Sequence, residues 1–218
     1  MKLFTHVPTA WQPYFNQDQL DGVGRILANQ PRNSWHPRLP RQIFRPLELT
    51  APDAFSVFLV GQDPYPAPGY PTGLPFEVTP TVPRKDWPLA LKNIDVELAA
   101  DVGRHLDRAN VHRWAKSGCL LWNVSPTCGI GGVSHRGRAF GWRAVTQGLI
   151  RSIAEERPVV FMCWGRVAHR LVKRDAATNG RPLVFAYHPA SRGLFPGERP
   201  FSRANEETAR LRLPSVGW

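Results

Sequence analysis

Short hydrophobic runs alternate with amphipathic segments along most of the chain. Four runs rich in apolar side chains end at glycine, asparagine or histidine, as buried strands do; they are residues 55–60, 119–122, 159–164 and 183–187. A helical period of apolar positions predicts helices over residues 14–29, 89–101, 108–116, 142–156, 167–174 and 201–211. Proline- or glycine-rich stretches predict irregular loops over residues 30–50, 61–83 and 129–141.

This alternation predicts an α/β fold. We expect a single three-layer domain over residues 1–218, with a central four-stranded, mostly parallel sheet flanked by helices. In such open sheets ligands bind beyond the carboxyl ends of the strands. The residues that follow the predicted strands are therefore candidates for a site, and they are Gln62, Asp63, Tyr65, Asn123, Arg166 and His188.

Each candidate also has an ordinary structural explanation. Asp63 precedes Pro64 and is typical of a turn, Asn123 is typical of a strand-end cap, and His188 is typical of a hydrogen-bonded structural histidine. A carboxylate, an amide and an imidazole converging at one edge indicate an α/β enzyme or binding protein. They do not name a substrate.

Charge adds information about the partner. The chain has 218 residues and a net charge of +11, and residues 131–218 carry +9 of it. A one-sided basic surplus favours a polyanion such as nucleic acid, although a basic solvated surface has the same composition. Three cysteines are too few for a disulfide framework or a four-cysteine cluster.

The chain also lacks the patterns that direct proteins to membranes. No apolar run approaches the roughly 18 residues that span a bilayer. Residues 1–12 do not resemble a signal peptide. We therefore expect a cytoplasmic, nucleoid-associated protein with no membrane partner.

Several motifs together resemble those of family 1 uracil-DNA glycosylases. Gly61-Gln62-Asp63-Pro64-Tyr65, followed by Gly73-Leu74-Pro75-Phe76, resembles that family's water-activating loop. Leu121-Trp122-Asn123 resembles the strand that carries its uracil-reading asparagine. Weaker similarities follow in the family's order, at residues 91–94, 159–165 and 188–191. The resemblance covers nearly the whole chain and implies a uracil-DNA glycosylase-like fold.

The resemblance implies an activity and two catalytic residues. It implies a monofunctional DNA glycosylase that hydrolyses the N-glycosidic bond of uracil in DNA and leaves an abasic site, as in base excision repair. Asp63 would stabilise the cationic sugar and orient the attacking water, and His188 would stabilise the negative charge developing on uracil O2. No metal or other cofactor is implied.

The resemblance also implies the residues that bind the substrate. The target base must first be flipped out of the duplex. Phe76 would then stack on uracil, Asn123 would pair with its N3–H and O4, Tyr65 would exclude the methyl group of thymine, and Gln62 would contribute nearby contacts. The residues expected to contact DNA are Lys92, Arg166, Ser191, Arg192 and Leu194.

Three positions depart from the family's pattern. Pro66 stands where the family usually has histidine, and Arg166 stands where it has a small residue, which suggests an added phosphate contact. The loop after His188 is about four residues short and has no leucine at the family's wedge position. Either Arg192 or Leu194 replaces that wedge, or the protein favours single strands, where flipping costs less.

The expected partner is uracil-containing DNA, single- or double-stranded, and the expected state is a monomer. The sequence leaves open whether a DNA-mimicking inhibitor protein binds, and the shortened loop would weaken such binding. Two alternatives stay open: a relative that prefers another damaged base, which Asn123 and Tyr65 disfavour, and a DNA-binding protein without catalysis, which Asp63 and His188 disfavour.

Overall fold

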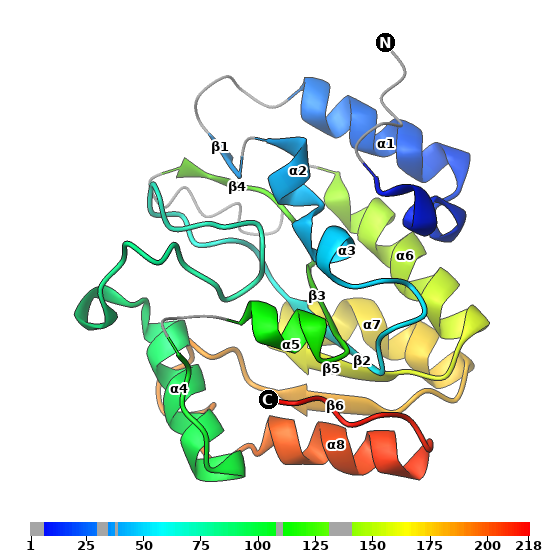
Figure 1. Cartoon of the computed structure of the whole chain (residues 1–218). Helices are drawn as coiled ribbons and strands as arrows, with labels where there is room; N and C mark the ends of the chain where they lie inside the picture. Colours follow the sequence, from blue (N-terminus) through cyan, green and yellow to red (C-terminus); the bar gives the residue numbers. More distant parts are fainter. Residues whose placement is uncertain (1–6, 30–34, 38, 108–110, 131–140) are drawn as a thin grey trace.

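The fold is built on one parallel sheet (Figure 1). The computed structural model describes residues 7–29, 35–37, 39–107, 111–130 and 141–218. The four strands lie in the order β3-β2-β5-β6, and every neighbouring pair is parallel. Their bounds are β2 (Val57–Gly61), β3 (Cys119–Asn123), β5 (Val160–Trp164) and β6 (Leu183–Ala186). This confirms the predicted α/β class.

Successive side chains of the central strand enter two different cores. Phe58 and Val60 belong to one buried cluster, whereas Val57 and Leu59 belong to the other. All five residues of β2 are buried, because helices cover both faces of the sheet. This is the expected pattern of a strand in the middle layer of three.

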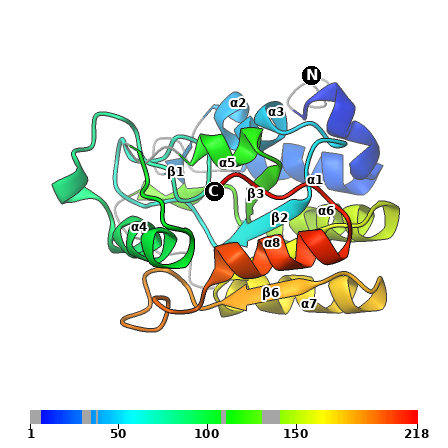
Figure 2. The ribbon, with the colours of Figure 1, turned by 60° about the horizontal axis from the view of Figure 1, so that its bottom comes forward.

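Two groups of helices form the outer layers (Figures 1 and 2). The first cluster is covered by α1 (Gln17–Ala28), α2 (Pro40–Ile43), α3 (Arg45–Leu49), α6 (Trp142–Glu156) and α7 (Arg166–Thr178). The second is covered by α4 (Leu89–Val102), α5 (His112–Lys116) and α8 (Pro200–Arg210). In the described part of the chain, no helix has the length and apolarity needed to cross a bilayer.

Most predicted elements are present, with small shifts at their ends. The helix over residues 142–156 has the predicted bounds, and α7 continues four residues beyond the predicted end at Arg174. The first helix begins at Gln17 instead of Tyr14, because the Asn16 side chain and Gln19 form a capping box there. A 3-10 helix, η2 (Thr9–Tyr14), comes before it. Residues 108–110 and 131–140, parts of a predicted helix and a predicted loop, lie outside the described residues.

The prediction of an irregular segment over residues 30–50 is wrong for its described part. β1 (Trp35–His36) pairs antiparallel with β4 (Cys128–Gly129), and α2 and α3 follow directly. Frequent proline is typical of irregular segments, yet Pro40 and Pro46 lie in the first turns of these helices. Proline suits that position, since a first-turn N–H has no intrahelical acceptor.

Candidate active site

The predicted site residues meet at the carboxyl edge of the sheet. Gly61 at the end of β2 lies opposite Asn123 at the end of β3. The pairing continues past the strands, because the amide of Ser125 donates to the carbonyl of Gln62 at 2.9 Å. On the other side, the amide of Gly165 after β5 donates to the carbonyl of Ala186, 2.9 Å away and two residues before His188. Parallel pairing therefore brings residues from distant parts of the sequence to one edge.

Phe76 and Asn123 pack around the missing side chain of Gly61. A Cβ atom at residue 61 would lie 2.4 Å from Asn123 Oδ1 and 2.9 Å from the Phe76 ring, so no larger residue fits. Asn123 is only 5% exposed. The Phe76 ring is 4.8 Å from the Trp164 ring, centroid to centroid. An amide and an aromatic ring thus lie side by side at the bottom of the candidate site.

The backbone of Phe76 has an uncommon conformation. Its φ angle is +63°, in the left-handed region that bulky residues avoid. Such a conformation costs about 1–3 kcal/mol and persists where the surroundings enforce it, often at functional sites. The sequence alone gave no sign of this strain, because the preceding residues could also form an ordinary turn.

His188 is held as a neutral hydrogen-bond donor. Its Nδ1 atom accepts from the backbone amide of Ala190 at 3.1 Å, so in the neutral ring Nε2 carries the proton. Burial lowers the pKa of His188 below its ordinary 6.5, which favours this neutral form. Gly165, with φ of +101°, allows the close approach: a Cβ there would lie 3.1 Å from His188 Cβ.

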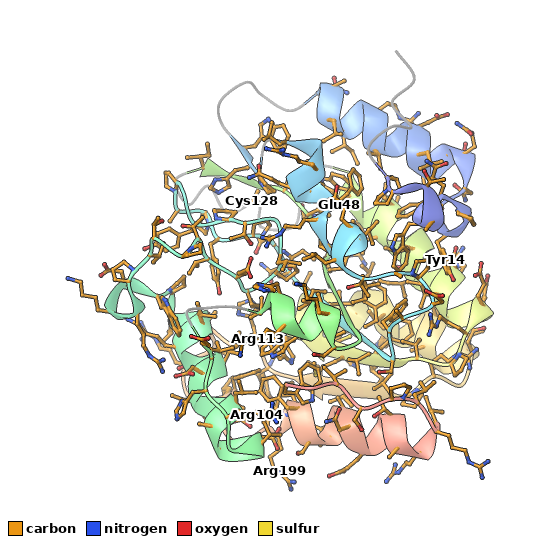
Figure 3. The ribbon with its side chains drawn as sticks, in the orientation of Figure 1. Tyr14, Glu48, Arg104, Arg113, Cys128 and Arg199 are labelled. Atoms are coloured by element: carbon orange, nitrogen blue, oxygen red, sulfur yellow. The ribbon has the colours of Figure 1, made fainter. Side chains whose placement is uncertain are left out.

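Asp63 and its neighbours lie on the loop that follows β2. Gln62 Nε2 donates to Asp63 Oδ1 over 3.5 Å. Next to this loop, the Cys128 thiol on β4 (labelled in Figure 3) lies 3.7 Å from the Tyr65 carbonyl oxygen. Burial, with a smaller contribution from the charge of Asp63, raises the pKa of Cys128 to about 12. Cys128 therefore contacts this loop as an uncharged thiol, and no motif in the sequence marks it.

Tyr65 presents a buried hydroxyl group. Its ring packs against the second core cluster, and its Oη atom is buried with no hydrogen-bond partner among the described residues. Burial raises the pKa of Tyr65, so the phenol stays protonated. Tyr65 therefore presents a neutral side chain two residues after Asp63.

The residues expected to contact DNA lie on exposed segments around this edge. Lys92 is exposed on α4, where its Nζ atom donates to the Lys85 carbonyl at 2.8 Å. One residue on, Asn93 Nδ2 donates to the Pro189 carbonyl at 2.7 Å, which ties α4 to the segment that carries His188. Arg166 is the exposed first residue of α7.

The segment after His188 is a short local turn. The amide of Ser191 donates to the His188 carbonyl at 2.7 Å, and the amide of Leu194 lies 3.4 Å from the Ser191 carbonyl. Arg192 is exposed, and Leu194 is 49% exposed although it is a large apolar residue. The structure therefore keeps both candidate wedge residues accessible and favours neither by contacts.

A sizeable cavity lies elsewhere in the molecule. It has a volume of about 510 Å³ and lies between α1 and α6. Its lining includes no predicted site residue and consists of Asn16, Asp18, Gln19, Gly22, Arg25, Ile26, Asn29, Gly141, Ala144 and Val145. The candidate active site is therefore identified by its convergent polar and aromatic groups rather than by cavity size.

Comparison with known proteins identifies the family. Residues 49–209 match the family model described as the uracil DNA glycosylase superfamily. The chain belongs to this superfamily. It is 38% identical to the uracil-DNA glycosylase of Bacillus subtilis (strain 168), over 82% of this chain and 79% of that protein. It is 42% identical to that of Mycobacterium tuberculosis (strain H37Rv), over 76% and 74%.

Solved structures agree on the fold. The crystal structure of mimivirus uracil-DNA glycosylase matches with a TM-score of 0.79 and 20% identity, over 100% of this chain and 89% of that one. The crystal structure of a variant of the mimivirus protein in complex with UGI matches with a TM-score of 0.80 and 20% identity. This match covers 100% of this chain and 91% of that one. At this identity the likeness concerns the fold.

Proposed function

We propose that this protein excises uracil from DNA by hydrolysing its N-glycosidic bond, as expected for base excision repair. The observation that carries the proposal is the meeting of Phe76, Asn123 and His188 at the edge of the sheet where the loop with Asp63 leaves β2, in a chain of this superfamily. The ring centroids of Phe76 and His188 are 6.4 Å apart. We treat residues 1–218 as one domain built around this site.

Base recognition is assigned to three side chains. Phe76 stacks on the flipped base, and the Asn123 amide offers an acceptor to N3–H and a donor to O4 of uracil. Cytosine presents the opposite donor and acceptor pattern at these atoms, and such polar mismatches discriminate by about 10⁴–10⁵. Tyr65, whose partly buried ring packs against the second core cluster, closes the space that the methyl group of thymine would need.

Bond cleavage produces a negative charge on the base and a positive charge on the sugar, and each catalytic residue stabilises one of these two charges. When the C1′–N1 bond breaks, its electron pair moves onto uracil and the sugar becomes oxocarbenium-like. His188 donates its Nε2 proton in a hydrogen bond to uracil O2, which stabilises the anionic base. The Asp63 carboxylate stabilises the sugar cation and orients the water that adds to C1′. The proton released by water neutralises the departing uracil.

DNA is held by exposed groups around the pocket. Arg166 is the first residue of α7, whose first turn contains no acidic residue. A cation at a helix N-terminus is unfavourable by itself, so a phosphate bound there would compensate it. Lys92, Ser191, Arg192 and Leu194 complete the proposed DNA-facing surface. Phosphate contacts of this kind position DNA without reading its sequence.

Further proposals concern the partners, the oligomeric state and the location of the protein. We propose a cytoplasmic, nucleoid-associated monomer that acts on single- or double-stranded DNA. A DNA-mimicking inhibitor, like the UGI seen with the mimivirus protein, would meet the short turn at residues 188–194 and bind weakly.

An oligonucleotide assay tests the function. Single- and double-stranded oligonucleotides that contain uracil, hypoxanthine or thymine are incubated with the protein, and abasic sites are then cleaved with alkali. We expect cleavage at uracil only. Cleavage at hypoxanthine instead would indicate another damaged base as substrate, and binding without cleavage of any strand would indicate a protein without catalysis.

A further inference from the structure

Glu77 is a buried carboxylate that the proposed reaction does not use. Its side chain is only 6% exposed, although it directly follows the strained residue Phe76. Two cationic or potentially cationic groups meet it from different helices. Arg45 Nη1, at the start of α3, lies 2.8 Å from Oε2, and His112 Nδ1, at the start of α5, lies 3.5 Å from Oε1.

Arg45 fastens both ends of the short turn that carries Phe76. The same Nη1 atom that pairs with Glu77 also donates to the Thr72 carbonyl at 3.1 Å. Just outside these residues, Pro71 and Val78 form an isolated antiparallel bridge. One guanidinium therefore holds the beginning and the end of residues 72–77, while the bridge closes the turn.

The backbone of the turn also packs directly against α2 at Gly73. A Cβ atom at Gly73 would lie 2.0 Å from the Gln42 carbonyl oxygen, so the backbone of α2 is in direct contact with the turn. Because Arg45 also bonds to Thr72 and Glu77, the 72–77 turn has little freedom to relax.

Fixing the turn matters because of the conformation of Phe76. A residue with a side chain at φ of +63° relaxes towards negative φ unless its neighbours prevent it. Such a rotation would move the Phe76 ring away from Trp164. It would also separate the ring from the Asn123 amide, beside which it now packs against Gly61. Consecutive side chains project in different directions, so Glu77 can be anchored among helices while Phe76 faces the pocket.

We propose that Glu77, Arg45 and His112 form a clamp that positions Phe76 for stacking on uracil. The inference rests on the proposed function, and Glu77 is a positioning residue that touches no substrate. Other buried carboxylates serve different segments: Asp175, for example, pairs with Arg151 at 3.4 Å towards the far end of α7. Among the buried carboxylates of the described residues, Glu77 alone is adjacent in sequence to a residue of the proposed pocket.

The first test compares Glu77→Gln with Asp175→Asn, a matched neutralisation of a buried carboxylate with an arginine partner. Both variants are assayed well below their unfolding temperatures. The measurements are kcat and KM for a single-stranded uracil oligonucleotide and the affinity for free uracil by calorimetry. We expect Glu77→Gln to weaken uracil binding and to lower kcat/KM by about 10- to 100-fold, as small misplacements near a reacting group do. Asp175→Asn should lower the unfolding temperature and leave both readouts unchanged.

The second test asks whether Glu77 acts through Phe76. In a double-mutant cycle, Glu77→Gln should cause little further loss in a Phe76→Ala background, because the ring that it positions is absent. If the fold-losses in kcat/KM of the two single variants multiply in the double variant, the clamp is overturned. A folded Glu77→Gln protein that binds and excises uracil like the wild type would overturn it as well. If Glu77→Gln does not fold, Arg45→Lys replaces it, since the lysine keeps the charge and loses the geometry of the guanidinium.

These outcomes separate the two proposals. A wild-type protein that cleaves no uracil strand overturns the proposed function, and the clamp with it. An active wild-type protein with an unaltered Glu77→Gln variant overturns the clamp alone.

Discussion

The base pocket and the DNA-facing turn of this protein are stabilised in different ways. Asn123 and Phe76 are buried, and their positions depend on strand register and on the space left by Gly61. Arg192 and Leu194 are exposed on a turn that a hydrogen bond from Asn93 to the Pro189 carbonyl ties to α4, and no described hydrogen bond beyond residues 188–194 holds either side chain. A sheet edge holds groups in fixed relative positions, whereas an exposed turn tolerates insertion and deletion. Base chemistry is thus the constrained part of the molecule, and DNA engagement is the adaptable part.

The largest expected effect tests the pocket itself. Asp63→Asn removes the negative charge that faces the proposed sugar cation, and we expect kcat to fall by about 10³-fold, the upper range for loss of one charge-stabilising group. The measurement is single-turnover excision from a uracil oligonucleotide. Asp107→Asn, which neutralises an exposed carboxylate paired with Arg113 on α5 (Figure 3), is the control and should retain full activity. Wild-type rates in Asp63→Asn would refute the assigned role.

The second prediction concerns His188 and pH. Because burial lowers its pKa, the neutral form persists somewhat below pH 6.5 and is lost as the pH falls through the lowered value. Protonation puts a hydrogen on Nδ1, which can then no longer accept from the Ala190 amide. We expect kcat to decline as the pH falls below the ordinary histidine pKa of 6.5, because the midpoint of this acid limb follows the lowered pKa of His188.

The matching variant is His188→Gln. It should lower kcat by about 10²-fold and remove this acid limb. The folded protein should also lose stability as the pH falls below about 6.5, since the unfolded state takes up the proton more readily. An acid limb that survives unchanged in His188→Gln would assign the titration to another group.

The third prediction tests the wall of the pocket. Tyr65→Ala should open space for a methyl group and admit thymine. We expect the ratio of thymine excision to uracil excision to rise by about 10- to 200-fold, since this is the usual discrimination that a pocket achieves against one extra carbon atom. The comparison is kcat/KM for uracil and thymine in the same single strand. Tyr14→Ala, far from the carboxyl edge (Figure 3), should not change this ratio. If thymine stays untouched in Tyr65→Ala, the steric account is wrong.

The smallest expected effect separates the two regions. Leu194→Ala and Arg192→Ala are each assayed on single- and double-stranded uracil substrates. A residue that fills the gap left by a flipped base should matter only in the duplex, so its variant should lose several-fold activity there and none on single strands. Equal losses on both substrates would mean phosphate contact instead. No loss in either variant would indicate that the protein works without a wedge.

Much of the fold could be predicted because it depends on local patterns. The apolar run before Gly61 and the amphipathic period of residues 142–156 each predict their element without knowledge of the rest of the chain. Residues 35–50 could not be predicted in this way. There, Pro40 and Pro46 lie in the first turns of short helices whose apolar side chains are stabilised by packing in the first core cluster.

The sequence by itself determined which residues follow the strands, and hence that Asp63, Asn123 and His188 belong to one edge. The tertiary structure alone decided how they are presented. The proton position on His188 depends on the Ala190 amide, the left-handed backbone of Phe76 is held within a turn closed by Arg45, and Gly61 makes room for two side chains at once. Arg45 and Glu77 are 32 residues apart in sequence. Contacts of this kind form only after the chain has folded, so no local pattern of hydrophobic and polar residues encodes them.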